Sequence, residues 1–129
     1  MATLIEKIVE TYIEVWGERD PARRATMIEA CFAPEGRIVT RGRDIVGRAA
    51  FDAAVADFQV RTEFRQIRLT SVIDAARTTF RFRGVVELAD GTSAESFDAG
   101  EIDATGRIAI LLTFVGPLAD PATSALPKA

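Results

Sequence analysis

Hydrophobic positions follow two different periods along this chain. In the first half they recur every three or four residues, the spacing that places side chains on one face of an α-helix. The first such stripe consists of Ile5, Ile8, Val9, Tyr12 and Trp16. The pattern predicts three helices, over Leu4 to Trp16, Asp20 to Phe32 and Arg48 to Val60.

From Phe64 onward, hydrophobic and polar residues alternate, as they do along a strand with one buried face. Turn-like segments at residues 74–76, 89–91 and 104–106 interrupt the alternation, so neighbouring strands are expected to be antiparallel. The expected strands are Phe64 to Ile73, Arg77 to Leu88, Thr92 to Asp103 and Arg107 to Val115. Earlier, after a turn at residues 33–36, two short strands are expected over Arg37 to Thr40 and Asp44 to Val46.

The strand expected at residues 92–103 carries a carboxylate on its inner face. Alternation puts Ser96 and Asp98 on one side and the acidic Glu95 and Glu101 on the other, which is therefore the solvent side. An inward carboxylate loses hydration, so it must find hydrogen-bond donors or keep its proton. Because the neighbours of Asp98 on this face are small, they leave space and indicate the wall of a cavity.

Helices followed by a long antiparallel sheet indicate an α+β fold. A twisted sheet that bends over helices encloses a cone, so we expect a cone-shaped curved sheet wrapped around the N-terminal helices. One domain is expected over residues 1–116, followed by a flexible tail at residues 117–129, which hold three prolines. Both faces of the last strand are apolar, so the sequence leaves open whether the face of Leu111 or that of Leu112 lines the cavity.

Composition narrows the chemistry that the chain can perform. The 129 residues include one cysteine and no histidine, which excludes an internal disulfide, a histidine-ligated metal and a nucleophile–histidine pair. Cys31 shares a predicted helix face with Met27 and Ile28, which favours a small buried hydrophobe over a nucleophile.

Charge and hydropathy also limit the expected partners. The formal net charge is −3, and 14 of the 16 basic residues are arginines scattered along the chain, so we expect no nucleic-acid partner. The N-terminal segment carries acidic residues early and has no long apolar run, which argues against a signal peptide or a membrane span. We therefore expect a cytoplasmic protein with no membrane partner.

Four motifs resemble the nuclear transport factor 2-like superfamily, which includes ketosteroid isomerases, SnoaL-like polyketide cyclases and limonene epoxide hydrolases. They are YIEVWGERD at residues 12–20, CFAPEG at 31–36, IVGRAAF at 45–51 and FDAGEIDATGRI at 97–108. The resemblance covers about Ile5 to Gly116 and implies a cone that is partly hollow. It is more specific for the fold than for an activity, because many members of the superfamily catalyse no known reaction.

The resemblance to ketosteroid isomerase implies roles for particular residues. That family has a tyrosine eight positions before the acid that opens the second helix, which here is Tyr12, and a protonated aspartic acid eight positions before the glycine of the last turn, which here is Asp98. The two would form an oxyanion hole. The position of the family's aspartate base is occupied by Thr40, which cannot act as a base, and Asp44 in the neighbouring hairpin is the candidate substitute.

The same resemblance implies a pocket for a small, largely apolar ligand, without a metal or cofactor. The sequence leaves two functions open: a proton-transferring isomerase or cyclase, or a non-catalytic binding or dimerisation module in which Tyr12 and Asp98 form a structural pair. The relay of the epoxide hydrolases is disfavoured, because Arg81 and Arg83 alternate with inward phenylalanines and face away from the cavity. The residues expected to line the pocket are Trp16, Phe32, Ile38, Thr40, Phe51, Val55, Phe58, Phe80, Phe82, Ser96 and Leu111.

Members of the superfamily commonly pair through the open face of the sheet. In this chain that face is expected to carry Arg81, Arg83, Glu95 and Glu101, and such mixed charges complement themselves in a two-fold contact. The resemblance therefore implies a homodimer through the sheet face.

Overall fold

A computed structural model describes residues 3–61, 63–118 and 120–122. Its helices are α1 (Leu4–Val15), α2 (Pro21–Cys31) and α3 (Arg48–Arg61). Its strands are β1 (Phe32–Val39), β2 (Asp44–Val46), β3 (Phe64–Leu69), β4 (Asp74–Ala76), β5 (Thr79–Leu88), β6 (Ser93–Ile102) and β7 (Ile108–Val115). Most of the expected tail, residues 119 and 123–129, lies outside the described residues, so the domain boundary stays a prediction.

The helices begin and end for local reasons. Thr3 caps α1, since its side-chain oxygen accepts a hydrogen bond from the Glu6 backbone N–H at 3.2 Å. Asp20 precedes α2 as its N-cap residue and Pro21 fills the first helical position, where no backbone N–H is needed. The helix stops at Cys31 because Phe32 adopts an extended backbone and starts a strand.

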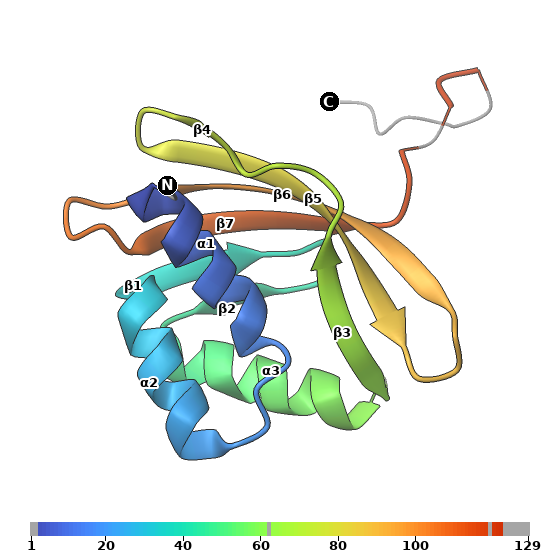
Figure 1. The fold of residues 1–129 in the computed structure, drawn as a ribbon, viewed down its shortest axis with the longest axis horizontal. Helices are drawn as coiled ribbons and strands as arrows, with labels where there is room; N and C mark the ends of the chain where they lie inside the picture. The colour runs from blue at the N-terminus through green and yellow to red at the C-terminus, as the bar shows by residue number, and fades with distance from the viewer. Residues whose placement is uncertain (1–2, 62, 119, 123–129) are drawn as a thin grey trace.

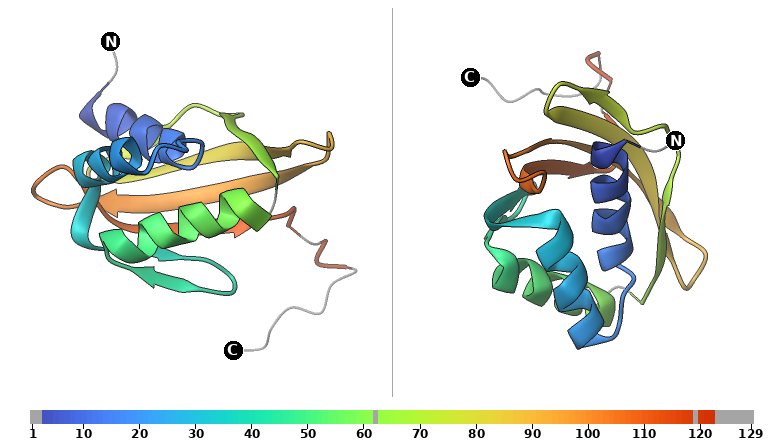
Figure 2. Two further views of the ribbon diagram at one scale, coloured as in Figure 1. Left: turned by 90° about the horizontal axis from the view of Figure 1, so that it is seen from below. Right: turned by 60° about the vertical axis from the view of Figure 1, so that its left-hand side comes forward.

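The strands of the described residues form one curved sheet, in the order β2-β1-β7-β6-β5-β3, with β4 added beside β5. All neighbouring strands are antiparallel except β1 and β7, which are parallel. The helices lie on the concave side of this sheet (Figures 1 and 2), so that the interior is closed by α1 and α3. The predicted α+β fold with a curved, mostly antiparallel sheet is confirmed.

The segment after α2 differs from the sequence-based prediction. Residues 33–36 were expected to form a turn before a strand starting at Arg37, but β1 begins at Phe32 and runs through them. The register with β7 shifts between Phe32 and Arg37, which indicates a bulge that absorbs the irregular residues. Gly36 is required there, because a Cβ atom would lie 2.7 Å from the ring of Phe32.

The segment between β3 and β5 also differs. Asp74–Ala76 were expected to be a turn, but they form β4 and pair with the start of β5. The tight reversal falls instead after β4, where Arg77 adopts a left-handed backbone with φ of 57°. The strand expected from Phe64 to Ile73 accordingly ends at Leu69, and β5 begins at Thr79 rather than Arg77.

The register of β5, β6 and β7 divides the interior of the cone into a solid end and a hollow part. Phe80 lies opposite Gly100, which lies opposite Leu111, and these three form one inward rung. The ring of Phe80 fills the space above Gly100, since a Cβ atom there would lie 2.7 Å from it. The next inward rung consists of Phe82, Asp98 and Thr113.

The inner face of β7 is settled by an irregularity in its pairing. The register shifts at Ile102, so that Ile102 pairs with Ile108 whereas Glu101 pairs with Ile110. Ile108 is buried before this shift and Leu111 is buried after it, while Leu112 points outward. The face of Leu111 is therefore the one directed toward the cavity.

Candidate functional site

A cavity of about 180 Å³ lies in the hollow part of the cone, between α1 and the concave face of the sheet. Its walls are largely apolar, and residues from two helices, four strands and the segment after β1 contribute to them. The lining residues are Tyr12, Ile13 and Trp16 from α1, Thr40 after β1, Phe58 from α3, Ile67 from β3, Phe82 and Val86 from β5, Ser96 and Asp98 from β6, and Thr113 and Val115 from β7.

Asp98 brings a carboxyl group into this apolar wall. The residue is 5% exposed, and its Oδ1 atom is buried without a hydrogen-bond partner among the described residues. Burial raises the pKa of this carboxyl from 3.8 to about 7, although the hydroxyls of Thr113 and Ser96 interact with it and act in the opposite direction. At pH values below about 7 the carboxyl is therefore mainly neutral and can donate a hydrogen bond as well as accept one.

Tyr12 lines the same cavity from α1 and is 3% exposed. Burial holds the pKa of its phenol well above the usual value of 10, and the nearby negative charge of Asp98 adds to this rise. A hydrogen bond from the indole of Trp16 to the phenol opposes the rise in pKa. Tyr12 is therefore a neutral hydroxyl donor over the whole physiological pH range, directed by its neighbour Trp16.

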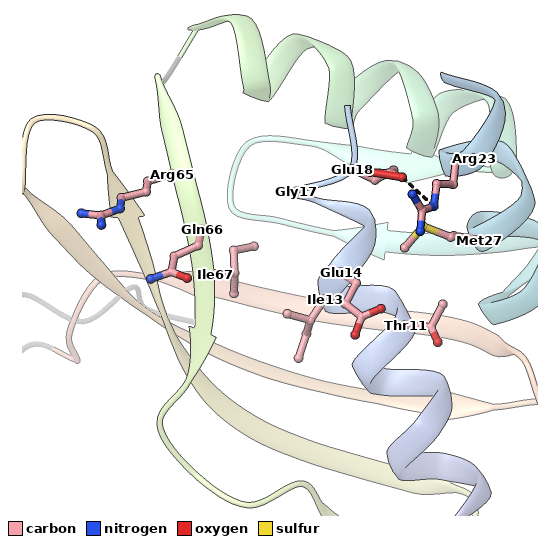
Figure 3. A pocket seen from close by; sticks show the side chains of 10 residues that line it. All are labelled: Thr11, Ile13, Glu14, Gly17, Glu18, Arg23, Met27, Arg65, Gln66 and Ile67. Carbon is pink, nitrogen blue, oxygen red and sulfur yellow. Dashed lines mark ion pairs between the residues drawn. The ribbon is translucent and has the colours of Figure 1, made fainter. Parts of the chain in front are cut away.

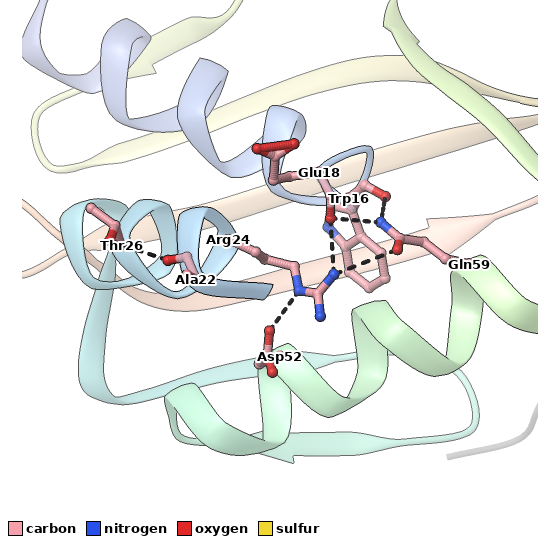
Figure 4. A network of polar contacts seen from close by, with 7 residues as sticks. All are labelled: Trp16, Glu18, Ala22, Arg24, Thr26, Asp52 and Gln59. Carbon is pink, nitrogen blue, oxygen red and sulfur yellow. Dashed lines mark hydrogen bonds and ion pairs between the residues drawn. The ribbon is translucent and has the colours of Figure 1, made fainter. Parts of the chain in front are cut away.

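The end of α1 that carries Trp16 is held by a buried polar network (Figure 4). The Gln59 side chain on α3 donates to the backbone carbonyls of Trp16 and Glu18 at 2.9 and 3.0 Å. The guanidinium of Arg24, only 5% exposed, donates to the same Glu18 carbonyl at 2.9 Å and forms a 2.6 Å ion pair with Asp52. A cation at the carboxyl end of a helix also opposes the negative end of its dipole. The network thereby fixes the helix end from which Trp16 enters the cavity.

The structure brings seven of the residues named from the sequence together around this cavity: Tyr12, Trp16, Thr40, Phe58, Phe82, Ser96 and Asp98. The other expected pocket residues are buried in the packed core and do not line it: Phe32, Ile38, Phe51, Val55, Phe80 and Leu111. Their place follows from the register, because the rung of Phe80 and Leu111 belongs to the solid end of the cone. Phe51 supports the site from behind, with its ring centroid 5.6 Å from that of Tyr12.

Asp44 does not line the cavity. Its two carboxylate oxygens accept hydrogen bonds from the guanidinium of Arg37 at 3.1 and 2.9 Å, on the exposed side of the β1–β2 hairpin. Thr40 does line the cavity, and its hydroxyl oxygen accepts a hydrogen bond from the Arg43 backbone N–H at 2.9 Å. The sequence-based candidate base thus lies on the surface, and the position of the family's base faces the cavity without a carboxylate.

Five lining residues were absent from the sequence-based set: Ile13, Ile67, Val86, Thr113 and Val115. Alternation along β5 places Val86 on the same inner side as Phe82, so the sequence pattern could have predicted Val86 as a lining residue. Thr113 and Val115 depend on the register shift near Ile102, which local periodicity does not reveal. Ile13 flanks the buried stripe of α1, and nothing in the sequence indicates that it meets β3.

The chemistry of the cavity is limited by its ionisable groups. Among the described lining residues only Tyr12 and Asp98 can ionise, so no second carboxylate accompanies Asp98 in the cavity wall. In the described part of the chain, no group of three or more His, Cys, Asp or Glu side chains is placed to hold a metal ion. No helix among residues 3–61, 63–118 and 120–122 is long and apolar enough to cross a membrane.

The sequence matches no protein-family model and no curated protein. Solved structures do match. A provisionally named isomerase of the SnoaL-like family from Agrobacterium tumefaciens has a TM-score of 0.80 at 24% identity, over 90% of this chain and 100% of that chain. A provisionally named ketosteroid isomerase from Kribbella flavida has a TM-score of 0.72 at 14% identity, over 98% of this chain and 91% of that chain.

A third structure is that of a protein with a ketosteroid isomerase-like fold from Catenulispora acidiphila, in complex with trimethylamine. It has a TM-score of 0.70 at 16% identity, and 93% of each chain is covered. At these identities the likenesses show the fold alone. The chain has the nuclear transport factor 2-like fold, as the sequence motifs indicated, and shares it with provisionally named isomerases.

The raised pKa of Asp98 predicts a specific pH dependence of stability. The folded protein keeps the proton up to about pH 7, whereas the unfolded chain loses it near pH 3.8, so unfolding releases a proton between these values. The free energy of unfolding contributed by Asp98 should therefore fall as the pH rises through this window, by about 4 kcal/mol in total. Urea denaturation at several pH values measures it.

The comparison for this prediction is Asp98→Asn, which has no carboxyl to titrate. The unfolding free energy of the wild type minus that of the variant should fall from pH 4 toward pH 7, because only the wild type loses stability as the pH rises. Asp57→Asn, on the exposed side of α3, serves as the matched surface control and should follow the wild type. If the unfolding free energies of wild type and Asp98→Asn changed in parallel with pH, Asp98 would be ionised in the folded protein at these pH values.

Proposed function

We propose that this chain, which has the nuclear transport factor 2-like fold, binds a small and largely apolar compound through one oxygen atom. Tyr12 and the neutral carboxyl of Asp98 donate hydrogen bonds to that oxygen, which is a carbonyl or phenol oxygen. The observation that carries the proposal is the buried Oδ1 atom of Asp98, which has no partner among the described residues and belongs to the wall of a cavity.

An unpartnered buried polar atom is unfavourable, because its lost hydration is not replaced. A ligand oxygen that accepts a hydrogen bond from the Asp98 carboxyl, or a ligand hydroxyl that donates to Oδ1, removes this penalty. Tyr12 lines the same cavity and supplies a second donor from a rigid helix. Two donors converging on one oxygen are the arrangement that stabilises an enolate-like charge.

The cavity size limits the ligand. Ligand pockets for drug-sized molecules usually span about 300–1,000 Å³, and this cavity measures about 180 Å³. A dry apolar cavity of about 150 Å³ is enough to hold benzene. A compound with a single six-membered ring therefore fits the space, and a four-ring steroid does not.

The absence of a second carboxylate among the described lining residues favours binding over catalysis. Enolisation next to a carbonyl needs a base within reach of the proton that is removed, and Thr40 occupies the position of that base. Our preferred function is therefore a binding protein for a one-ring carbonyl or phenolic compound. The second candidate, a proton-transferring isomerase or cyclase, is supported by the donor pair, which such an enzyme needs in the same place.

We also place a homodimer contact on the convex face of the sheet. Phe97 and Phe114 are cross-strand neighbours there and are 49% and 52% exposed, with Leu112 nearby on the same face. The charges expected for this contact lie on this face as well, but Arg81 is already engaged by Asp74 at 2.8 Å. The apolar pair of phenylalanines, rather than the charges, is the stronger argument for self-association.

Phenol binding tests the proposed donors, because a phenol presents one oxygen on one ring. Calorimetry at pH 6, where the carboxyl of Asp98 is neutral, should detect binding to the wild type. Tyr12→Phe removes one donor and should weaken binding by about 5- to 100-fold, the cost of leaving a buried hydrogen-bonding partner unsatisfied. Asp98→Asn replaces the acidic O–H by a weaker amide donor and should also weaken binding. Asp44→Asn should change nothing, since Asp44 lies outside the cavity. A phenol affinity that is unchanged in both cavity variants would contradict the proposal.

Thr40→Asp separates the two candidate functions. Asp preserves the turn contact with the Arg43 N–H and adds a carboxylate where the base is missing. If the donors are placed for enolate chemistry, the variant should convert 3-cyclohexenone to 2-cyclohexenone at least about 100-fold faster than the wild type, a gain typical of a positioned base. The gain should disappear in the double variant Thr40→Asp with Asp98→Asn. No gain in a variant that still binds phenol leaves binding as the only function.

Light scattering tests the dimer. The wild type should have the mass of two chains, and Phe97→Glu should shift it to one, because a charge would be buried in the contact. Val60→Glu on α3, at an 82% exposed position away from this face, is the matched control and should remain dimeric. A wild type that stays monomeric at high concentration would remove the proposed contact.

A further inference from the structure

A wide groove of about 580 Å³ runs along the outside of the molecule between α1 and β3 (Figure 3). The exposed flank of α1 forms one wall with Thr11 and Glu14, and β3 forms the other with Arg65 and Gln66. Arg23 of α2 closes one end of the groove, where it forms a 3.1 Å ion pair with Glu18. The groove is therefore larger and more polar than the inner cavity.

Two residues border both spaces. Ile13 of α1 and Ile67 of β3 line the outer groove and also the inner cavity, and Figure 3 shows their side chains pointing toward each other across the gap between helix and strand. No other described residue belongs to both walls. The partition between the cavity and the groove at this point is thus two aliphatic side chains thick.

The partition is thin because of the sheet topology. β3 is the last strand of the sheet and pairs only with β5, so no further strand covers its outer edge. Across the gap lies a helix, whose backbone hydrogen bonds are formed within itself. Side chains border the space between the helix and the edge of the strand, so the size of the side chains at positions 13 and 67 sets the width of the passage between the cavity and the groove.

The partition also lies in the direction in which an anchored ligand extends. Along β5, Phe82 lies opposite Asp98, and Val86 lies opposite Ile67. Val86 is therefore four residues beyond the rung of the anchoring carboxyl, a strand length of roughly 14 Å. A ligand whose oxygen is held by Asp98 and whose body extends along β5 approaches the partition at Ile67.

We propose that Ile13 and Ile67 determine the length of ligand that this site accepts. Their side chains restrict the cavity to one-ring compounds, and shortening either side chain joins the cavity to the outer groove, which then takes the far end of a longer ligand. The inference rests on the proposed binding function, because it uses Tyr12 and Asp98 as the anchor for the near end.

Calorimetry with phenol and 4-phenylphenol tests this role, since the two share the anchoring hydroxyl and differ in length. The wild type should bind 4-phenylphenol at least about tenfold more weakly than phenol, and Ile13→Ala and Ile67→Ala should each recover at least about tenfold in 4-phenylphenol affinity, the scale of a steric change in an apolar pocket. In both variants the ratio of 4-phenylphenol affinity to phenol affinity should rise at least about tenfold over wild type, and circular dichroism checks that the variants are folded.

Val86→Ala is the matched control. It enlarges the cavity at the same rung as Ile67, but Val86 does not border the groove, so 4-phenylphenol binding should not improve. An equal gain in this variant, no gain in either isoleucine variant, or a wild type that already binds both phenols equally would overturn the proposed role. If the wild type does not bind phenol, the proposed binding function itself fails, so the two failures are distinguishable.

Discussion

A carboxyl group that the sheet forces into an apolar interior is the constraint on which the rest of this structure depends. Strand alternation leaves Asp98 no route to solvent, because its neighbours Phe97 and Ala99 occupy the outer face. Burial makes the charged form unfavourable, and the pKa of the carboxyl rises to about 7. The fold tolerates the free-energy cost of this unpartnered oxygen because Asp98 lies in the middle of β6, which pairs with a strand on each side. Such a group gains a partner only when something enters the cavity.

The cone leaves room for a ligand beside Asp98, because its interior is packed at one end and hollow beyond it. The ring of Phe80 over Gly100 closes the narrow part, and the helices pack against it. One rung further, no described side chain fills the space in front of Asp98, and Trp16 and Tyr12 cover it from the opposite side. The buried network of Arg24 and its partners holds that end of α1, so most of the cavity wall comes from helices and strands.

Local periodicity carries most of the fold and the centre of the site. It places Tyr12 on the inner face of a helix and Asp98 on the inner face of a strand, because both positions follow from spacing alone. It fails where distant segments decide the outcome. The start of β1 at Phe32 depends on a parallel pairing with β7, the last strand along the chain. The position of Ile13 and Ile67 on the same two cavity walls depends on which helix lies beside the edge of the sheet, and no spacing in the sequence encodes that.

In this fold Asp98 is a neutral carboxyl that faces a cavity at a pH where ordinary carboxyls are ionised. Carbon-13 NMR of protein labelled at the aspartate carboxyls measures its protonation directly, with Asp98→Asn identifying the resonance. We expect a titration midpoint near pH 7 for this one carboxyl. A midpoint close to the ordinary value of 3.8 would mean that Asp98 is charged and satisfied in the fold, and that the cavity holds no neutral acid to donate to a ligand.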